Sequence, residues 1–123
     1  MSYYISRTKP VFKDWQFHSL SEGVDKEDWL AVADKFDNLQ KSSEEGGYRL
    51  YSVQNPKFHT YLRQNPNLGN AITLSHFPER FKGEFAKYLK QICDLLHANL
   101  YVLNNKGVME AVSYTHLTLP TKA

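Results

Sequence analysis

The clearest hydrophobic pattern in the chain lies between residues 78 and 96. Apolar side chains recur there at the three- and four-residue spacing of one helical face, and charged or amide side chains occupy the other side. Pro78 suits the first turn of a helix, and Glu79 behind it suits the positive end of the helix dipole. The pattern predicts an amphipathic helix whose apolar face contains Phe81, Phe85, Tyr88, Leu89, Ile92, Leu95 and Leu96.

A shorter helix is predicted to begin after Asp25 and to fade around Asn38. Asp25 is a residue type that often caps a helix N-terminus, and Glu27 and Asp28 place negative charge in the first turn. The apolar residues that follow recur on one helical face: Trp29, Val32, Ala33 and Phe36.

Four further segments have the composition of strands, with β-branched and aromatic residues between turn signals. They are residues 3–7, 48–53, 71–75 and 99–103, and the last continues through a turn at 104–107 into a returning strand at 108–112. Three segments fit no strand or helix clearly. Residues 11–23 fit a short strand or a loop laid over the core, residues 41–47 fit a polar loop, and residues 55–69 fit a punctuated stretch with one helical turn.

The predicted order is therefore β-α-β-β-α-β with a C-terminal hairpin. This order predicts an α+β domain over residues 1–112, in which two helices cover one face of an antiparallel sheet, as in a ferredoxin-like sandwich. The length of 123 residues suits one domain with one core.

Composition and charge narrow the function classes. Apolar residues make up 41% of the chain and charged residues 23%, which is ordinary for a folded domain. A formal net charge of +2 disfavours nucleic acid as a partner. The single cysteine, Cys93, excludes an intramolecular disulfide, residues 1–7 lack a signal-peptide pattern, and no apolar run approaches membrane-spanning length. We therefore expect a cytoplasmic protein with no membrane partner.

The C-terminal residues 112–123 differ in character from the rest of the chain. They read Val-Ser-Tyr-Thr-His-Leu-Thr-Leu-Pro-Thr-Lys-Ala, without a turn or cap signal. This string resembles a translated sequencing adapter, of the kind that ends reading frames assembled from environmental DNA. The resemblance predicts that residues 113–123 are a non-native tail.

Two blocks of sequence resemble a group of small, largely uncharacterised bacterial proteins, some of which are immunity-like. The first block comprises residues 1–5 and 24–30, and the second comprises residues 90–92 and 96–100 with Asn105-Lys106-Gly107 and Glu110. The group carries an acidic turn where this chain has Asn104, Asn105 and Lys106, and residues 9–23 look like an insertion relative to it. The resemblance implies an amphipathic helix followed by a strand, and no catalytic residues.

No catalytic, cofactor-binding or metal-binding residue is predicted. His18, His59, His76 and His97 have no Cys or His partner at a metal-ligand spacing, and the glycines do not form a phosphate-binding loop. Cys93 lies late in its predicted helix, where the dipole opposes a thiolate, so we interpret it as core filler.

Partner binding is the remaining class of function. Trp15, Phe17 and His18 lie in a segment of mixed polarity, and Tyr51 with Arg49 shares one face of a regular strand. The alternative is that Trp15 and Phe17 cover the sheet or one end of the core. We predict a non-enzymatic binding module that occludes a protein partner, such as an immunity-like inhibitor of a toxin. The alternatives are a small oligomeric ligand-binding domain or enzyme, and a weak RNA-binding domain with Tyr51 on the open face of its sheet.

Overall fold

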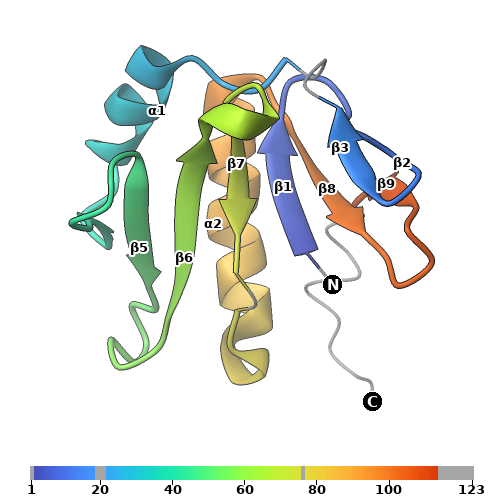
Figure 1. Ribbon diagram of the computed structural model, residues 1–123. Helices are drawn as coiled ribbons and strands as arrows, with labels where there is room; N and C mark the ends of the chain where they lie inside the picture. The colour runs from blue at the N-terminus through green and yellow to red at the C-terminus, as the bar shows by residue number, and fades with distance from the viewer. Residues whose placement is uncertain (1, 19–21, 76, 114–123) are drawn as a thin grey trace.

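The computed structural model describes residues 2–18, 22–75 and 77–113. Within these residues, seven strands form one antiparallel sheet in the order β4-β5-β6-β7-β1-β8-β9, and β2 and β3 form a separate two-stranded hairpin (Figure 1). The strands are β1 (Ser2–Ser6), β2 (Val11–Lys13), β3 (Gln16–His18), β4 (Leu39–Lys41), β5 (Gly47–Tyr51), β6 (His59–Asn65), β7 (Ala71–Leu74), β8 (Asn99–Leu103) and β9 (Met109–Ala111).

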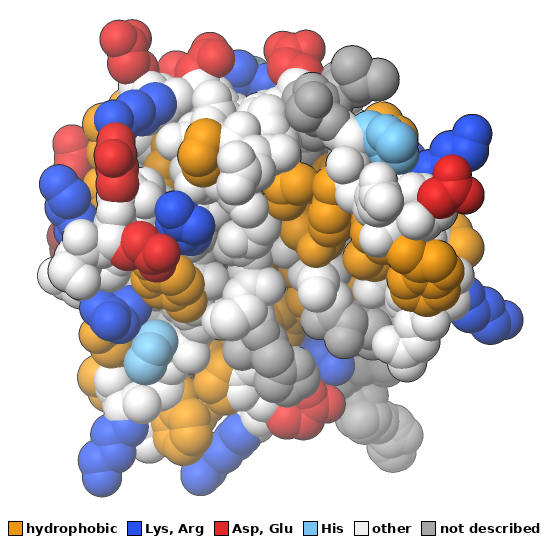
Figure 2. Space-filling model, viewed as in Figure 1, with side chains coloured by type: hydrophobic (Ala, Val, Ile, Leu, Met, Phe, Trp, Pro, Cys, Tyr) orange, Lys and Arg blue, Asp and Glu red, His pale blue; other side chains and the backbone are white. Residues whose placement is uncertain are grey.

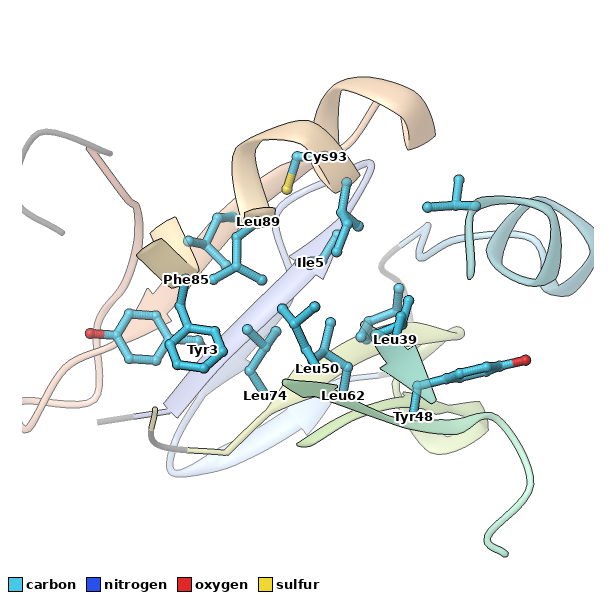
Figure 3. Close-up of a cluster of buried hydrophobic side chains, with 14 of the residues drawn as sticks. Tyr3, Ile5, Leu39, Tyr48, Leu50, Leu62, Leu74, Phe85, Leu89 and Cys93 are labelled. Carbon is cyan, nitrogen blue, oxygen red and sulfur yellow. The ribbon is translucent and has the colours of Figure 1, made fainter. Parts of the chain in front are cut away.

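Two α-helices, α1 (Lys26–Ala33) and α2 (Lys82–Leu96), pack into one core cluster with the inner face of the sheet. Four residues of α2 that the sequence placed on its apolar face are buried and Tyr88 is half-buried, whereas Leu95 is exposed. Figure 3 shows Phe85 and Leu89 of α2 facing side chains of the sheet such as Ile5. Short 3₁₀ helices at Pro66–Leu68 and Glu79–Phe81 complete the elements.

Strand β1, which lies between β7 and β8, separates two clusters of buried side chains. Successive side chains of a strand point to opposite faces of the sheet. Tyr3 and Ile5 accordingly belong to the main core under the helices, whereas Tyr4 belongs to a second cluster on the outer face. The second cluster comprises Tyr4, Leu68, Ala71, Tyr101 and Met109, with Phe12, Phe17 and Leu103 packed against it.

The α+β class and the antiparallel sheet are confirmed, but the ferredoxin-like order is not. The connection from β7 through α2 to β8 encloses β1, as a split βαβ unit requires. The sheet is nevertheless wider than the predicted one, because β4 extends one edge and β6 lies between β5 and β7, while β9 at the other edge is the predicted returning strand.

Strand β6 is the largest element that the sequence did not predict. Its inward positions are Thr60, Leu62 and Gln64, all buried, and only one of these is apolar. The alternation of apolar and polar residues that signals a strand is therefore missing. Thr60 Oγ1 instead donates a hydrogen bond to the Ser75 carbonyl oxygen at 3.1 Å, and Gln64 Nε2 donates to the Val24 carbonyl oxygen. Because both polar side chains have partners, neither Thr60 nor Gln64 is buried without a hydrogen bond.

Several predicted boundaries were wrong by a few residues. Helix α1 ends at Ala33, several residues before Asn38, and the side chain of Asp25 makes no capping hydrogen bond. The predicted loop at 41–47 is shorter, since Lys41 belongs to β4 and Gly47 to β5. The predicted tail beyond Ser113, and His76, lie outside the described residues.

Arg7 and Glu84 join elements that are distant in sequence. Arg7 Nε donates to the Leu96 carbonyl oxygen at 3.0 Å, and its Nη atoms pair with Asp25 and Asp28 at 3.3 and 2.7 Å. Glu84 accepts hydrogen bonds from Ser52 Oγ at 2.6 Å and the Val53 amide at 2.7 Å. Burial would raise the pKa of Glu84, but these hydrogen bonds, together with those from the Tyr88 hydroxyl and the Gln54 amide, outweigh it and lower the pKa.

Candidate functional site

The hairpin β2–β3 lies over the outer face of the sheet beside β1, β8 and β9 (Figure 1). Its register pairs Val11 with His18, Phe12 with Phe17 and Lys13 with Gln16. The central pair faces the sheet, where the Phe17 ring lies 5.4 Å from the Tyr4 ring and 4.8 Å from the Phe12 ring. Edge-on aromatic contacts of this kind add to the area that the rings bury. Phe12 and Phe17 therefore anchor the hairpin.

Trp15 occupies the tip of the hairpin with an unusual backbone. Asp14 and Trp15 have φ angles of 54° and 59°, so both central residues of the turn lie in the left-handed region, as a type I′ turn requires. Gly and Asn are the residues that such turns favour, and a bulky side chain there is an outlier. The Trp15 side chain is 72% exposed. The fold therefore holds a large aromatic ring in solvent at a position that disfavours it.

The turn between β8 and β9 approaches Trp15. Gly107 has a φ of 78°, and a Cβ atom at this position would lie 3.3 Å from Cη2 of Trp15. The side chain of Val108 is 48% exposed and that of Val11 is 38% exposed. A shallow groove between the start of β2 and the β8–β9 turn is lined by Pro10, Val11, Phe12, Gly107 and Val108, together with Lys9 and Met109. We call the exposed residues Val11, Trp15 and Val108 the tip patch.

The outer face of β5 and β6 carries a different surface. Arg49 pairs with Tyr61 across the two strands, and Tyr51 pairs with His59. The Arg49 guanidinium carbon lies 6.0 Å from the centre of the Tyr61 ring, and the Tyr51 and His59 rings lie 5.2 Å apart. We call these four residues the outer platform. Figure 2 shows basic and histidine side chains beside hydrophobic ones over β5 and β6, and hydrophobic ones gathered over the hairpin.

Glu44 closes one end of the outer platform. Its carboxylate accepts a hydrogen bond from the Tyr61 hydroxyl and pairs with Arg63 Nε at 3.3 Å. Burial and this hydrogen bond to Glu44 raise the pKa of Tyr61. A Cβ atom on Gly47 would lie 2.0 Å from the Tyr61 hydroxyl oxygen, so glycine leaves the room in which the ring lies across β5.

The four predicted partner-binding residues do not form one site. Trp15 is in the tip patch, and His18 is exposed on β3 beside Val11. Phe17 packs against the sheet, so it covers the sheet as the alternative interpretation of the sequence expected. Tyr51 shares the outer face with Arg49 but belongs to the outer platform, on the part of the sheet that the hairpin does not cover.

Sequence reasoning did not find Val108, Tyr61 or Arg63. Tyr61 and Arg63 flank the buried Leu62 along β6, so both point to the outer face of the sheet. This placement could be inferred from the sequence only if residues 59–65 were first assigned as a strand. Val108 reaches the tip patch through the fold alone, because the β8–β9 turn and the hairpin tip are far apart in sequence.

In the described parts of the chain, no group of three or more His, Cys, Asp or Glu side chains is placed to bind a metal ion. Cys93 is buried in α2. Across the same residues, no helix has both the length and the apolar character needed to cross a bilayer.

Comparisons with known proteins give no relative from which a function could be carried over. The chain matches no protein-family model, no curated protein and no solved structure. The resemblance to immunity-like bacterial proteins therefore stays a prediction, and the functional argument depends on the site itself.

Proposed function

We propose that this protein is a non-enzymatic binding module that docks onto another protein through the tip patch. The observation that carries the proposal is Trp15, which is largely exposed while its backbone lies in the left-handed region. The best-fitting class is an immunity-like inhibitor that occludes a bacterial toxin. The segment that forms the hairpin is the one that looks like an insertion in the sequence.

The free energy of folding gives little reason for tryptophan at this position. A left-handed conformation costs an L-residue roughly 1–2 kcal/mol, and glycine would avoid that cost. The buried part of the side chain, which includes an edge-on contact with the Phe12 ring at 6.0 Å between centroids, offsets this cost, but 72% of the side chain stays exposed and contributes nothing to the fold. Contact with a partner would bury the ring, and tryptophan is among the residues that contribute most to protein interfaces.

The surroundings of Trp15 suit the centre of an interface. Val11 and Val108 extend the apolar surface, and the exposed side chains of Lys13, Gln16 and His18 lie on β2 and β3 around it. An apolar centre with a polar rim is the usual anatomy of an interface. A stable complex buries about 800 Å² on each partner, so a partner would also contact the faces around the tip patch.

Coexpression with the product of a neighbouring gene in the source DNA tests the proposal. We expect a stable complex on size-exclusion chromatography and, if the partner is a toxin, rescue of growth. The variant Trp15→Gly should lose the complex, because it removes the ring and keeps a residue that the turn favours. Val53→Ser is the matched control, since Val53 is 66% exposed and lies between β5 and β6, away from the hairpin. Equal binding by Trp15→Gly and the native chain would contradict the proposal.

A cytoplasmic location belongs to the same proposal. Cys93 is buried and is the chain's single cysteine, which suits a reducing compartment. The second predicted class, an oligomeric ligand-binding domain or enzyme, needs a site shared between subunits. A strictly monomeric protein on size-exclusion chromatography would remove that alternative.

A further inference from the structure

The outer platform is a compact block of three rings and one guanidinium group on a sheet face. Directly opposed side chains on neighbouring antiparallel strands have Cβ atoms about 5 Å apart. Arg49, Tyr51, His59 and Tyr61 form two such pairs that are adjacent along β5 and β6. Arg63 continues the row on β6, where its partner Gly47 contributes no side chain.

This block is not explained by core packing. The inner sides of the same two strands bury Leu50 and Leu62 completely, and these residues join β5 and β6 to the main core. On the outer side, Arg49 and His59 are exposed and the rings of Tyr51 and Tyr61 are only partly buried. No described residue of the hairpin joins them, because the aromatic anchors of the hairpin pack with Tyr4.

We propose that the outer platform binds a short single-stranded nucleic acid. Bases stack on exposed aromatic rings whatever their sequence, and open sheet faces with aromatic side chains serve this purpose in RNA-binding domains. Tyr51, His59 and Tyr61 supply ring faces and edges, and the guanidinium of Arg49 matches a phosphate group. The proposal does not depend on the protein partner, because it uses a different part of the outer face.

The charges around the platform predict weak binding with a defined salt dependence. The net charge of +2 disfavours strong attraction by the whole chain, so the attraction must be local. Arg63 is paired with Glu44 at 3.3 Å, so Arg49 remains to neutralise about one phosphate, which gives a log–log salt slope near −0.7 for a single strand. Affinity should then fall about two- to threefold between about 50 mM and about 200 mM salt.

Glu44 provides a further test of the proposal, because its negative charge should oppose the binding of a phosphate group that Arg49 favours. Its carboxylate holds Tyr61 and Arg63 in place but also brings negative charge to the end of the platform. Replacing it with the neutral isostere in Glu44→Gln should raise affinity about two- to fivefold by removing that charge. A ligand without negative charge gives no reason for such a gain.

Fluorescence anisotropy of a labelled oligouridine of about ten nucleotides provides the test. The native chain should bind, Tyr51→Ala should weaken binding about tenfold, and Arg49→Gln should reduce the salt slope by about 0.7. Val53→Ser is a control that should bind like the native chain. Arg49→Gln changes an exposed side chain, so it keeps the test decisive if Tyr51→Ala does not fold. A matched oligothymidine shows which sugar the platform prefers.

Two results would overturn the proposal. One is the absence of salt-sensitive binding by the native chain to both oligonucleotides. The other is binding that Arg49→Gln, Tyr51→Ala and Glu44→Gln leave unchanged. If these variants instead weaken the complex with the protein partner, the platform is part of the protein interface and the nucleic-acid proposal fails, while the proposed function stands.

Discussion

The outer face of the sheet has two halves that use the same residue types in different ways. Over β1, β8 and β9, the aromatic rings of Tyr4 and Tyr101 are covered by the hairpin and belong to a buried cluster. Over β5 and β6, Tyr51 and Tyr61 lie beside arginine and histidine and no described hairpin residue covers them. Whether an aromatic residue on the outer face stabilises the fold or is free to contact a ligand therefore depends on what covers it. Its residue type and its position in the strand do not distinguish the two roles.

The largest difference between the halves should appear in stability. Phe17→Ala removes a ring that anchors the hairpin and leaves space beside Tyr4, so the free energy of unfolding should fall by about 2–3 kcal/mol. Tyr51→Ala, on the uncovered half, should lower it by less than about 1 kcal/mol. Urea denaturation of both variants measures the contrast. Equal losses would mean that the two halves are equally buried.

A second prediction concerns the contact between the two turns. Gly107→Ala places a Cβ at a φ of 78° and 3.3 Å from the Trp15 ring, so the free energy of unfolding should fall by about 1–2 kcal/mol. Thermal melts measure this loss, and an alanine variant as stable as the native chain would contradict the left-handed turn.

Trp15→Gly should change stability least among the hairpin substitutions. The turn gains a residue that favours the left-handed region, and this gain offsets the small contact area that the exposed ring loses. We expect the free energy of unfolding to stay within about 1 kcal/mol of the native value. A larger loss in urea denaturation would show that Trp15 supports the fold, and the case for a binding role would weaken.

The smallest expected effect is the pH dependence of the covered half. Burial raises the pKa of Tyr4, against a smaller opposing effect of a hydrogen bond with Ser2. The unfolded chain then releases the Tyr4 proton at lower pH than the folded chain, so stability is lost as pH rises above about 10. Tyr4→Phe should lessen this loss, which melting temperatures at about pH 9 and about pH 11 would reveal. An unchanged pH dependence would contradict burial of this hydroxyl.

Much of the fold could be predicted from the sequence because the main core follows simple periodicity. The apolar residues of α2 recur on one helical face. Strands β1, β7 and β8 are short segments rich in apolar and aromatic residues, which is typical of strands. Strand β6 could not be predicted, since Thr60 and Gln64 occupy inward positions and satisfy their hydrogen bonds only after folding.

The candidate site was predictable only in part, for a related reason. The segment 11–18 was identified by its mixed polarity, but Phe17 turns inward while Trp15 turns outward. The difference depends on a two-residue turn at Asp14 and Trp15, and tryptophan is not a residue from which such a turn is inferred. The β8–β9 turn brings Gly107 to the Trp15 ring and Val108 into one groove with Val11 through tertiary contacts that no local pattern records.

The proposed role of the tip patch can be tested most directly by fluorine NMR of the intact chain with fluorotryptophan. The two signals should be distinct, because Trp15 is 72% exposed and Trp29 is fully buried, and Trp15→Gly assigns them. In the free protein, only the Trp15 signal should respond to exchange of water for deuterium oxide. Adding the product of the neighbouring gene should shift the Trp15 signal and leave the Trp29 signal in place. A Trp15 signal that is shielded in the free protein, or unchanged in a complex, would contradict the proposed role of the tip patch.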